Sequence, residues 1–75
     1  MPALLKKCSG KECVRILCNK FGFSMKRQKG SHVVLRKETQ GCTIPLHNSL
    51  AVGTLRGAIR QAGITVAEFV RAFEG

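Results

Sequence analysis

The chain has 75 residues and a formal net charge of +9, because thirteen Lys and Arg face only four Asp and Glu. This length corresponds to one domain, residues 1–75, and the charge indicates a polyanionic partner, with nucleic acid as the first choice. The sequence has no Trp or Tyr, which argues against a membrane-surface helix and so against a membrane partner.

Four cysteines are present, Cys8, Cys13, Cys18 and Cys42, and no two have the Cys-x-x-Cys spacing of a structural zinc site. The first residues lack the sustained apolar run of an export signal. We therefore expect a cytoplasmic protein with reduced thiols, no metal and no other cofactor. Cys13 and Cys18 are expected as small core residues, and Cys8 is the one thiol left open to a reactive role.

The first predicted element is a helix that follows a loose lead-in at residues 1–8. Ser9 and Glu12 have the spacing of a capping box, in which each side chain accepts from the backbone of the other. Apolar residues then recur on one helical face across positions 13–21, and Gly22 ends the pattern.

Alternating residues at 23–28 and 32–37 predict a hairpin, and its turn decides which side chains share a face. A two-residue Gly30-Ser31 loop pairs His32 with Lys29 but mixes apolar and charged side chains on both faces. A three-residue loop, 29–31, puts the apolar and the charged side chains on separate faces. We expect this loop because the register of a hairpin follows its hydrophobic pattern. The apolar face then carries Phe23, Met25, Val33 and Leu35, with Arg27 opposite Val33. The solvent face carries Ser24, Lys26, Gln28, His32 and Arg36.

A turn at 38–41 leads to a third predicted strand at 42–45, followed by a polar loop that starts at His47. A helix at 53–62, which Gly63 ends, and another that starts at a capping box of Thr65 and Glu68 predict one broken helix. The resulting fold class is α+β, of the α-β-β-β-α type, with a three-stranded antiparallel sheet and helices packed on one face. Double-stranded-RNA-binding domains (dsRBDs) share that architecture.

Several short motifs, in this order and at these spacings, resemble a HicA-type toxin. They are Gly22-Phe23, Arg27 to His32, Thr43 to His47, Gly53 to Arg56, Gln61 to Ile64, and Glu68-Phe69. The resemblance covers nearly everything from Ser9 to the end of the chain. It implies a dsRBD-like fold, an mRNA-cleaving toxin of a toxin–antitoxin pair, and a HicB-type antitoxin that binds and blocks it. His32 takes the position of the catalytic histidine.

The chemistry of the hairpin agrees with this role. RNA carries its own nucleophile, the 2′-OH, so a nuclease needs proton transfer, which an imidazole performs near neutral pH, and charge stabilisation. The four Glu are scattered along the chain, so we do not expect a two-metal site.

Two roles remain open for His47: a second acid or base, or a structural residue of the loop. The residues expected to contact RNA are Lys26, Gln28, Lys29, Gly30, Ser31, Arg36 and Lys37. The alternative function is a non-catalytic RNA-binding module, which grips RNA by shape and phosphate contacts. In either case we expect the free domain to be monomeric.

Overall fold

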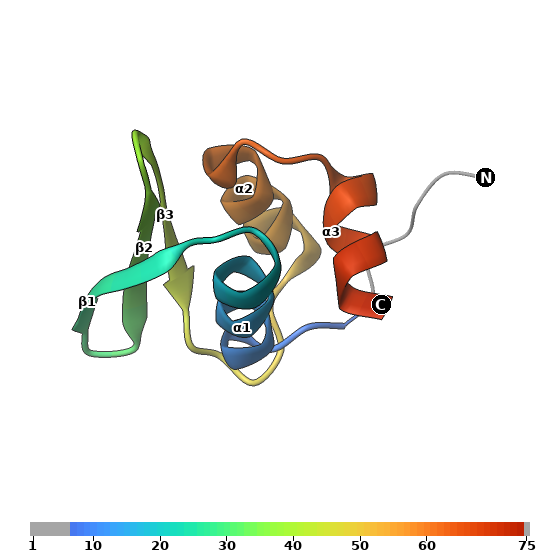
Figure 1. The fold of residues 1–75 in the computed structure, drawn as a ribbon. Coiled ribbons are helices and arrows are strands. Elements are labelled where there is room, and N and C mark those ends of the chain that lie inside the picture. The colour runs from blue at the N-terminus through green and yellow to red at the C-terminus, as the bar shows by residue number, and fades with distance from the viewer. Residues whose placement is uncertain (1–6, 75) are drawn as a thin grey trace.

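The computed structural model describes residues 7–74, which form three helices and three strands (Figure 1). In chain order these are α1 (Gly10–Lys20), β1 (Ser24–Lys29), β2 (His32–Lys37), β3 (Gln40–Pro45), α2 (Val52–Ala62) and α3 (Val66–Glu74). The predicted α+β order is confirmed, and the predicted broken helix is the pair α2 and α3. The part of the predicted lead-in before Lys7 lies outside the described residues.

The sheet and the helices form layers, which Figure 1 shows with the sheet nearly edge-on. The strands are antiparallel in the order β1-β2-β3. Helices α1 and α2 pack against one face of this sheet, and α3 contacts both helices from the side away from the sheet. No helix of the described residues covers the opposite face, so the sheet presents a free surface, as predicted.

Apolar side chains between the layers form one buried cluster. Its largest fully enclosed members are Phe69, Leu17, Leu35, Ile44, Leu55 and Ile59. Burying one such side chain contributes roughly 1.5–3 kcal/mol, so these contacts across the layers supply most of the stabilisation. They fix the sheet against α1 and α2 and thereby fix which sheet face stays free.

Both predicted capping boxes are present. The Ser9 hydroxyl accepts from the Glu12 N–H at 3.1 Å, and the Glu12 carboxylate accepts from the Ser9 N–H at 3.0 Å. Thr65 and Glu68 make the equivalent pair of bonds at the start of α3, at 3.0 and 2.8 Å. Gly63 ends α2 with a φ of 78°, in the left-handed region that favours glycine. These local patterns were therefore reliable guides to the helix ends.

The thiols belong to the core. Cys13 and Cys42 are buried, and so is Cys8, whose backbone carbonyl accepts from the Leu50 N–H at 2.8 Å. Burial raises the pKa of Cys8 to about 11, with a further contribution from the Glu12 carboxylate, and it raises the pKa of Cys13 to about 12. The prediction of a loose lead-in is thus wrong at Cys8. The thiolate that a reactive Cys8 needs is strongly disfavoured. Cys18 is half-buried.

The hairpin register differs from the prediction. Lys29 pairs with His32, Gln28 with Val33 and Arg27 with Val34, so the turn contains only Gly30 and Ser31. The predicted three-residue loop is wrong. Gly30 takes a φ of 60°, which suits the first central position of a II′ turn, and such a turn matches the twist of its strands.

A β-bulge reconciles the two-residue turn with the hydrophobic pattern. The register shifts between Met25 and Arg27, where Lys26 is the extra residue, and Met25 therefore still pairs with Leu35. The two-residue turn sets Arg27 opposite Val34 and Gln28 opposite buried Val33. Met25 is 56% exposed, contrary to the prediction, because β1 is an edge strand whose residues are all exposed.

The second hairpin also has a shorter turn than predicted. Lys37 pairs with Gln40, so β3 begins at Gln40 instead of Cys42, and only Glu38 and Thr39 connect the strands. Cys42 and Ile44 nevertheless face the core, as alternation requires.

Candidate functional site

The free side of the sheet carries the candidate site, and we call it the open face. Val33, Leu35 and Ile44 are buried against the helices. Their strand neighbours therefore point the other way, and residues paired across antiparallel strands share a face. The open face consists of three rows: Lys29, His32 and Pro45; Arg27, Val34 and Thr43; and Ser24, Arg36 and Gly41.

His32 is exposed at one end of the open face, as predicted. Lys29 lies directly opposite on β1, and the Cβ atoms of such a pair are about 5 Å apart. Arg27 belongs to the next row, within about 7–8 Å on the diagonal. The imidazole thus lies beside cationic side chains from the neighbouring strand.

Hydrogen bonds on both sides of the turn hold the backbone at His32. The Gln28 side-chain amide donates to the Gly30 carbonyl at 3.1 Å. The Leu46 N–H donates to the Ser31 carbonyl at 2.6 Å. The turn is therefore joined to β1 on one side and to the end of β3 on the other, which fixes the place from which the imidazole extends.

The sequence-based prediction omitted Arg27 and included Gln28 as an RNA contact because the two-residue turn exchanges the faces that a three-residue loop gives them. Arg27 shares the open face with His32, whereas Gln28 lies on the helix side, where Val33 and Leu46 line the same groove. The available signal was the Gly30-Ser31 pair itself, since Gly at the first position of a two-residue loop is typical of a II′ turn.

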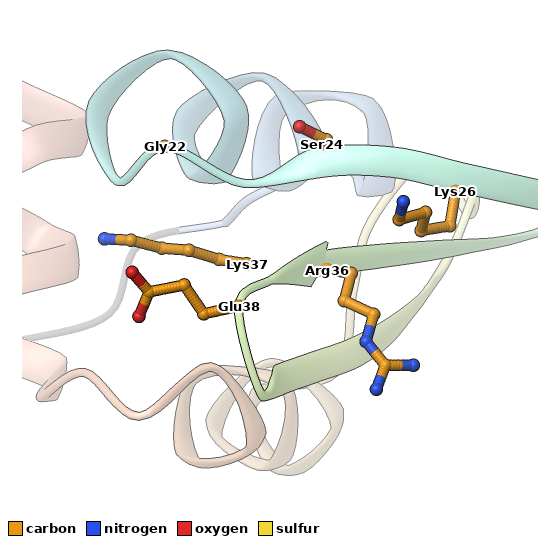
Figure 2. Close-up of a pocket in the computed structure, with 6 residues that line it drawn as sticks. All are labelled: Gly22, Ser24, Lys26, Arg36, Lys37 and Glu38. Carbon is orange, nitrogen blue, oxygen red and sulfur yellow. The ribbon is translucent and has the colours of Figure 1, made fainter.

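Three other predicted contacts meet at the far end of the sheet. Lys26, Arg36 and Lys37 line a shallow concavity of about 580 Å³ together with Gly22, Ser24 and Glu38 (Figure 2). Arg36 lies four residues along β2 from His32, roughly 13 Å away at about 3.3 Å per residue. The predicted RNA contacts therefore fall into two groups, one at each end of the sheet.

His47 is exposed and lies two residues beyond Pro45, the β3 partner of His32. Its backbone carbonyl accepts from the Gly10 N–H at 2.9 Å and so ties this loop to the start of α1. The structural contact that was considered for the His47 ring is thus made by the backbone of this residue.

Within residues 7–74, no three or more His, Cys, Asp or Glu side chains are grouped so that they hold a metal ion. In that range, no helix is both long enough and apolar enough to cross a membrane.

Comparison with known proteins identifies the family. A family model described as the HicA toxin of bacterial toxin-antitoxin matches residues 10–64, from the start of α1 to just beyond α2. This match spans most of the chain, including the open face and both histidines, and it defines a toxin of a bacterial toxin–antitoxin system. The chain belongs to the HicA toxin family, as its motifs indicated, and a toxin of such a system has an antitoxin partner. No curated protein and no solved structure matches the chain.

Proposed function

We propose that this toxin is a metal-independent endoribonuclease that cleaves mRNA and so inhibits translation, with His32 as its general acid or base. The observation that carries the proposal is the position of His32, which is exposed beside Lys29 and Arg27 on the open face. The whole arrangement lies inside the segment that matches the HicA family.

The reaction uses the nucleophile that RNA supplies. The 2′-oxygen attacks the adjacent phosphorus, and the imidazole of His32 removes the 2′-OH proton as a general base. The P–O5′ bond breaks, and the departing 5′-oxygen takes up a proton. The products are a 2′,3′-cyclic phosphate and a 5′-OH. Lys29 and Arg27 stabilise the extra negative charge that develops on the phosphorane oxygens.

We assign the second proton to His47. Its ring is exposed on the segment that follows Pro45, the cross-strand partner of His32. Because the His47 carbonyl ties the loop to α1, a change confined to the ring leaves that tie intact. His47→Ala should therefore lower the cleavage rate by about 10²-fold or more, the usual contribution of a general acid, without lowering the melting temperature. Full activity in this variant would make His47 a loop residue without a catalytic role.

The open face also indicates how an antitoxin inhibits the toxin. We propose that a HicB-type protein neutralises the toxin by covering the open face, so that His32 no longer reaches RNA. The excess of positive charge favours an acidic contact surface on that partner and a fast, salt-sensitive association.

Expression without any antitoxin tests the proposed function. The wild-type chain should arrest growth, and His32→Ala should not. Lys11→Ala, which changes an exposed residue of α1, is the control and should remain toxic. If wild type and His32→Ala were equally harmful or equally harmless, the non-catalytic RNA-binding module would be the better description of the chain.

A further inference from the structure

The concavity at the end of the sheet opposite His32 has a composition of its own. Figure 2 shows Lys26 and Arg36 extending from adjacent strands, while Lys37 extends toward Gly22. Together with Ser24, these side chains supply three cationic groups and one hydroxyl around one shallow depression. Lys26 and Arg36 are cationic donors of the kind that bind phosphate oxygens, and Lys37 adds positive charge to the lining of the same depression.

The bulge is the reason that Lys26 takes part. Lys26 is the extra residue of β1 and has no partner on β2, so its side chain is not tied to either row of the regular ladder. Bulges commonly redirect a side chain in this way. The two-residue turn therefore places Arg27 beside the His32 row, and the bulge leaves Lys26 at the far concavity.

The separation from His32 excludes the scissile phosphate as the occupant of the concavity. Roughly 13 Å along β2 separates His32 from Arg36. Consecutive phosphates of one RNA strand lie closer together than this, so the distance spans more than one nucleotide step. A strand whose cleaved bond lies at His32 thus brings a different phosphate to the concavity.

The residues between the two ends indicate how the strand is held. None of the open-face residues is Phe, Tyr or Trp, and the middle row offers Arg27, Val34 and Thr43. A surface without these large rings gives bases little to stack on, so contacts to the RNA backbone dominate. Contacts of this kind position a strand without reading its sequence.

We propose that the concavity lined by Lys26, Arg36 and Lys37 is a second subsite, which binds a backbone phosphate of single-stranded RNA a few nucleotides from the cleaved bond. This inference rests on the proposed RNA substrate. It makes the toxin dependent on RNA length, because a fragment that fills only the His32 end loses the second contact.

Glu38 places one negative charge at the subsite. Its carboxylate lines the same concavity, beside Lys37 in Figure 2. A like charge repels a phosphate, so neutralising Glu38 should strengthen binding at this subsite and nowhere else. The subsite thus predicts opposite effects on RNA binding for substitution of Glu38 and for substitution of its cationic neighbours.

RNA binding measured in a His32→Ala background tests the subsite, because binding is read without cleavage. The probes are a fluorescent RNA dodecamer and a trinucleotide of matching sequence. Lys26→Ala/Arg36→Ala should weaken dodecamer binding by roughly tenfold and reduce the salt slope of log K by about 0.7, the value for one phosphate contact on a single strand. Trinucleotide binding should not change. Glu38→Gln should bind the dodecamer severalfold more tightly.

Lys11→Ala/Arg15→Ala is the matched control, since it removes the same charge from exposed positions of α1. If this pair weakened dodecamer binding as much as the Lys26/Arg36 pair, general charge attraction would replace the subsite. Weaker binding of Glu38→Gln would also overturn it. If the wild type failed to cleave RNA while the length-dependent loss remained, the subsite would stand and only the proposed catalysis would fall.

Discussion

Deleting Lys26 tests the β-bulge, the feature that keeps Met25 opposite Leu35 although the turn contains only two residues. In the observed register the deletion leaves every other β1–β2 pair in place. Met25 still pairs with Leu35, and Arg27 still pairs with Val34. The shortened strand simply becomes regular, and no buried side chain changes face.

The magnitude follows from what the deletion moves. Lys26 is exposed and unpaired, so we expect the free energy of unfolding to change by no more than about 1 kcal/mol, as for most exposed positions. Without a bulge, the same deletion would shift Ser24 and all preceding residues by one position. Phe23, which is only 4% exposed, would then leave the core at a cost of about 3–5 kcal/mol.

Urea and thermal denaturation followed by circular dichroism separate these cases. For a domain of this size 1 kcal/mol corresponds to about 4–8 °C in the melting temperature. Deletion of Val34 is the control, because it moves the fully buried Leu35 to the wrong face and should cost about 2–5 kcal/mol. The reasoning is refuted if the Lys26 and Val34 deletions are equally destabilising.

Three further changes test other parts of the structure. Gly30→Ala should destabilise the fold by about 1–2 kcal/mol, because Gly30 has a φ of 60° although the space around its Cα is open. Gly57→Ala, in the interior of α2, should instead stabilise the fold by about 0.5–1 kcal/mol. Equal melting temperatures for the two variants would contradict this reasoning. Ser9→Ala should cost about 1 kcal/mol in urea denaturation through loss of the α1 cap, and a neutral result would contradict the capping box. Burial raises the pKa of Cys13 to about 12 in the folded chain, whereas the thiol of the unfolded chain loses its proton above about pH 8.5. The free energy of unfolding should therefore keep the contribution of this thiol below pH 8.5 and lose it as the pH rises toward 12. Cys13→Ala should show a shallower fall by about 1.4 kcal/mol per pH unit at most, and an unchanged slope would count against the buried thiol.

Local sequence signals predicted the features that depend on a few neighbouring residues. The capping boxes at Ser9 and Thr65 were correct because each bond joins residues three apart. Gly63 was correct because only glycine adopts its backbone conformation without strain. His32 was placed on the solvent face correctly because its neighbour Val33 must be buried.

The predictions that failed concern a bulge that no local pattern signals and a contact between residues far apart in the chain. The bulge at Lys26 satisfies the two-residue turn and the burial of Phe23 at the same time, and no residue near Lys26 signals it. The burial of Cys8 depends on its bond to Leu50, across most of the sequence. Alternation alone therefore assigned Arg27 and Gln28 to the wrong faces, and with them part of the candidate site.

Analysis of the RNA ends tests the proposed chemistry of His32 most directly. Purified wild-type toxin and His32→Ala are incubated with mRNA in excess EDTA, and the ends of the fragments are identified by mass spectrometry. The wild type should yield 2′,3′-cyclic phosphate and 5′-OH ends, and His32→Ala should yield no fragments. Fragments with 5′-phosphate ends, cleavage only when Mg²⁺ is present, or equal cleavage by both proteins would contradict a metal-independent reaction at His32.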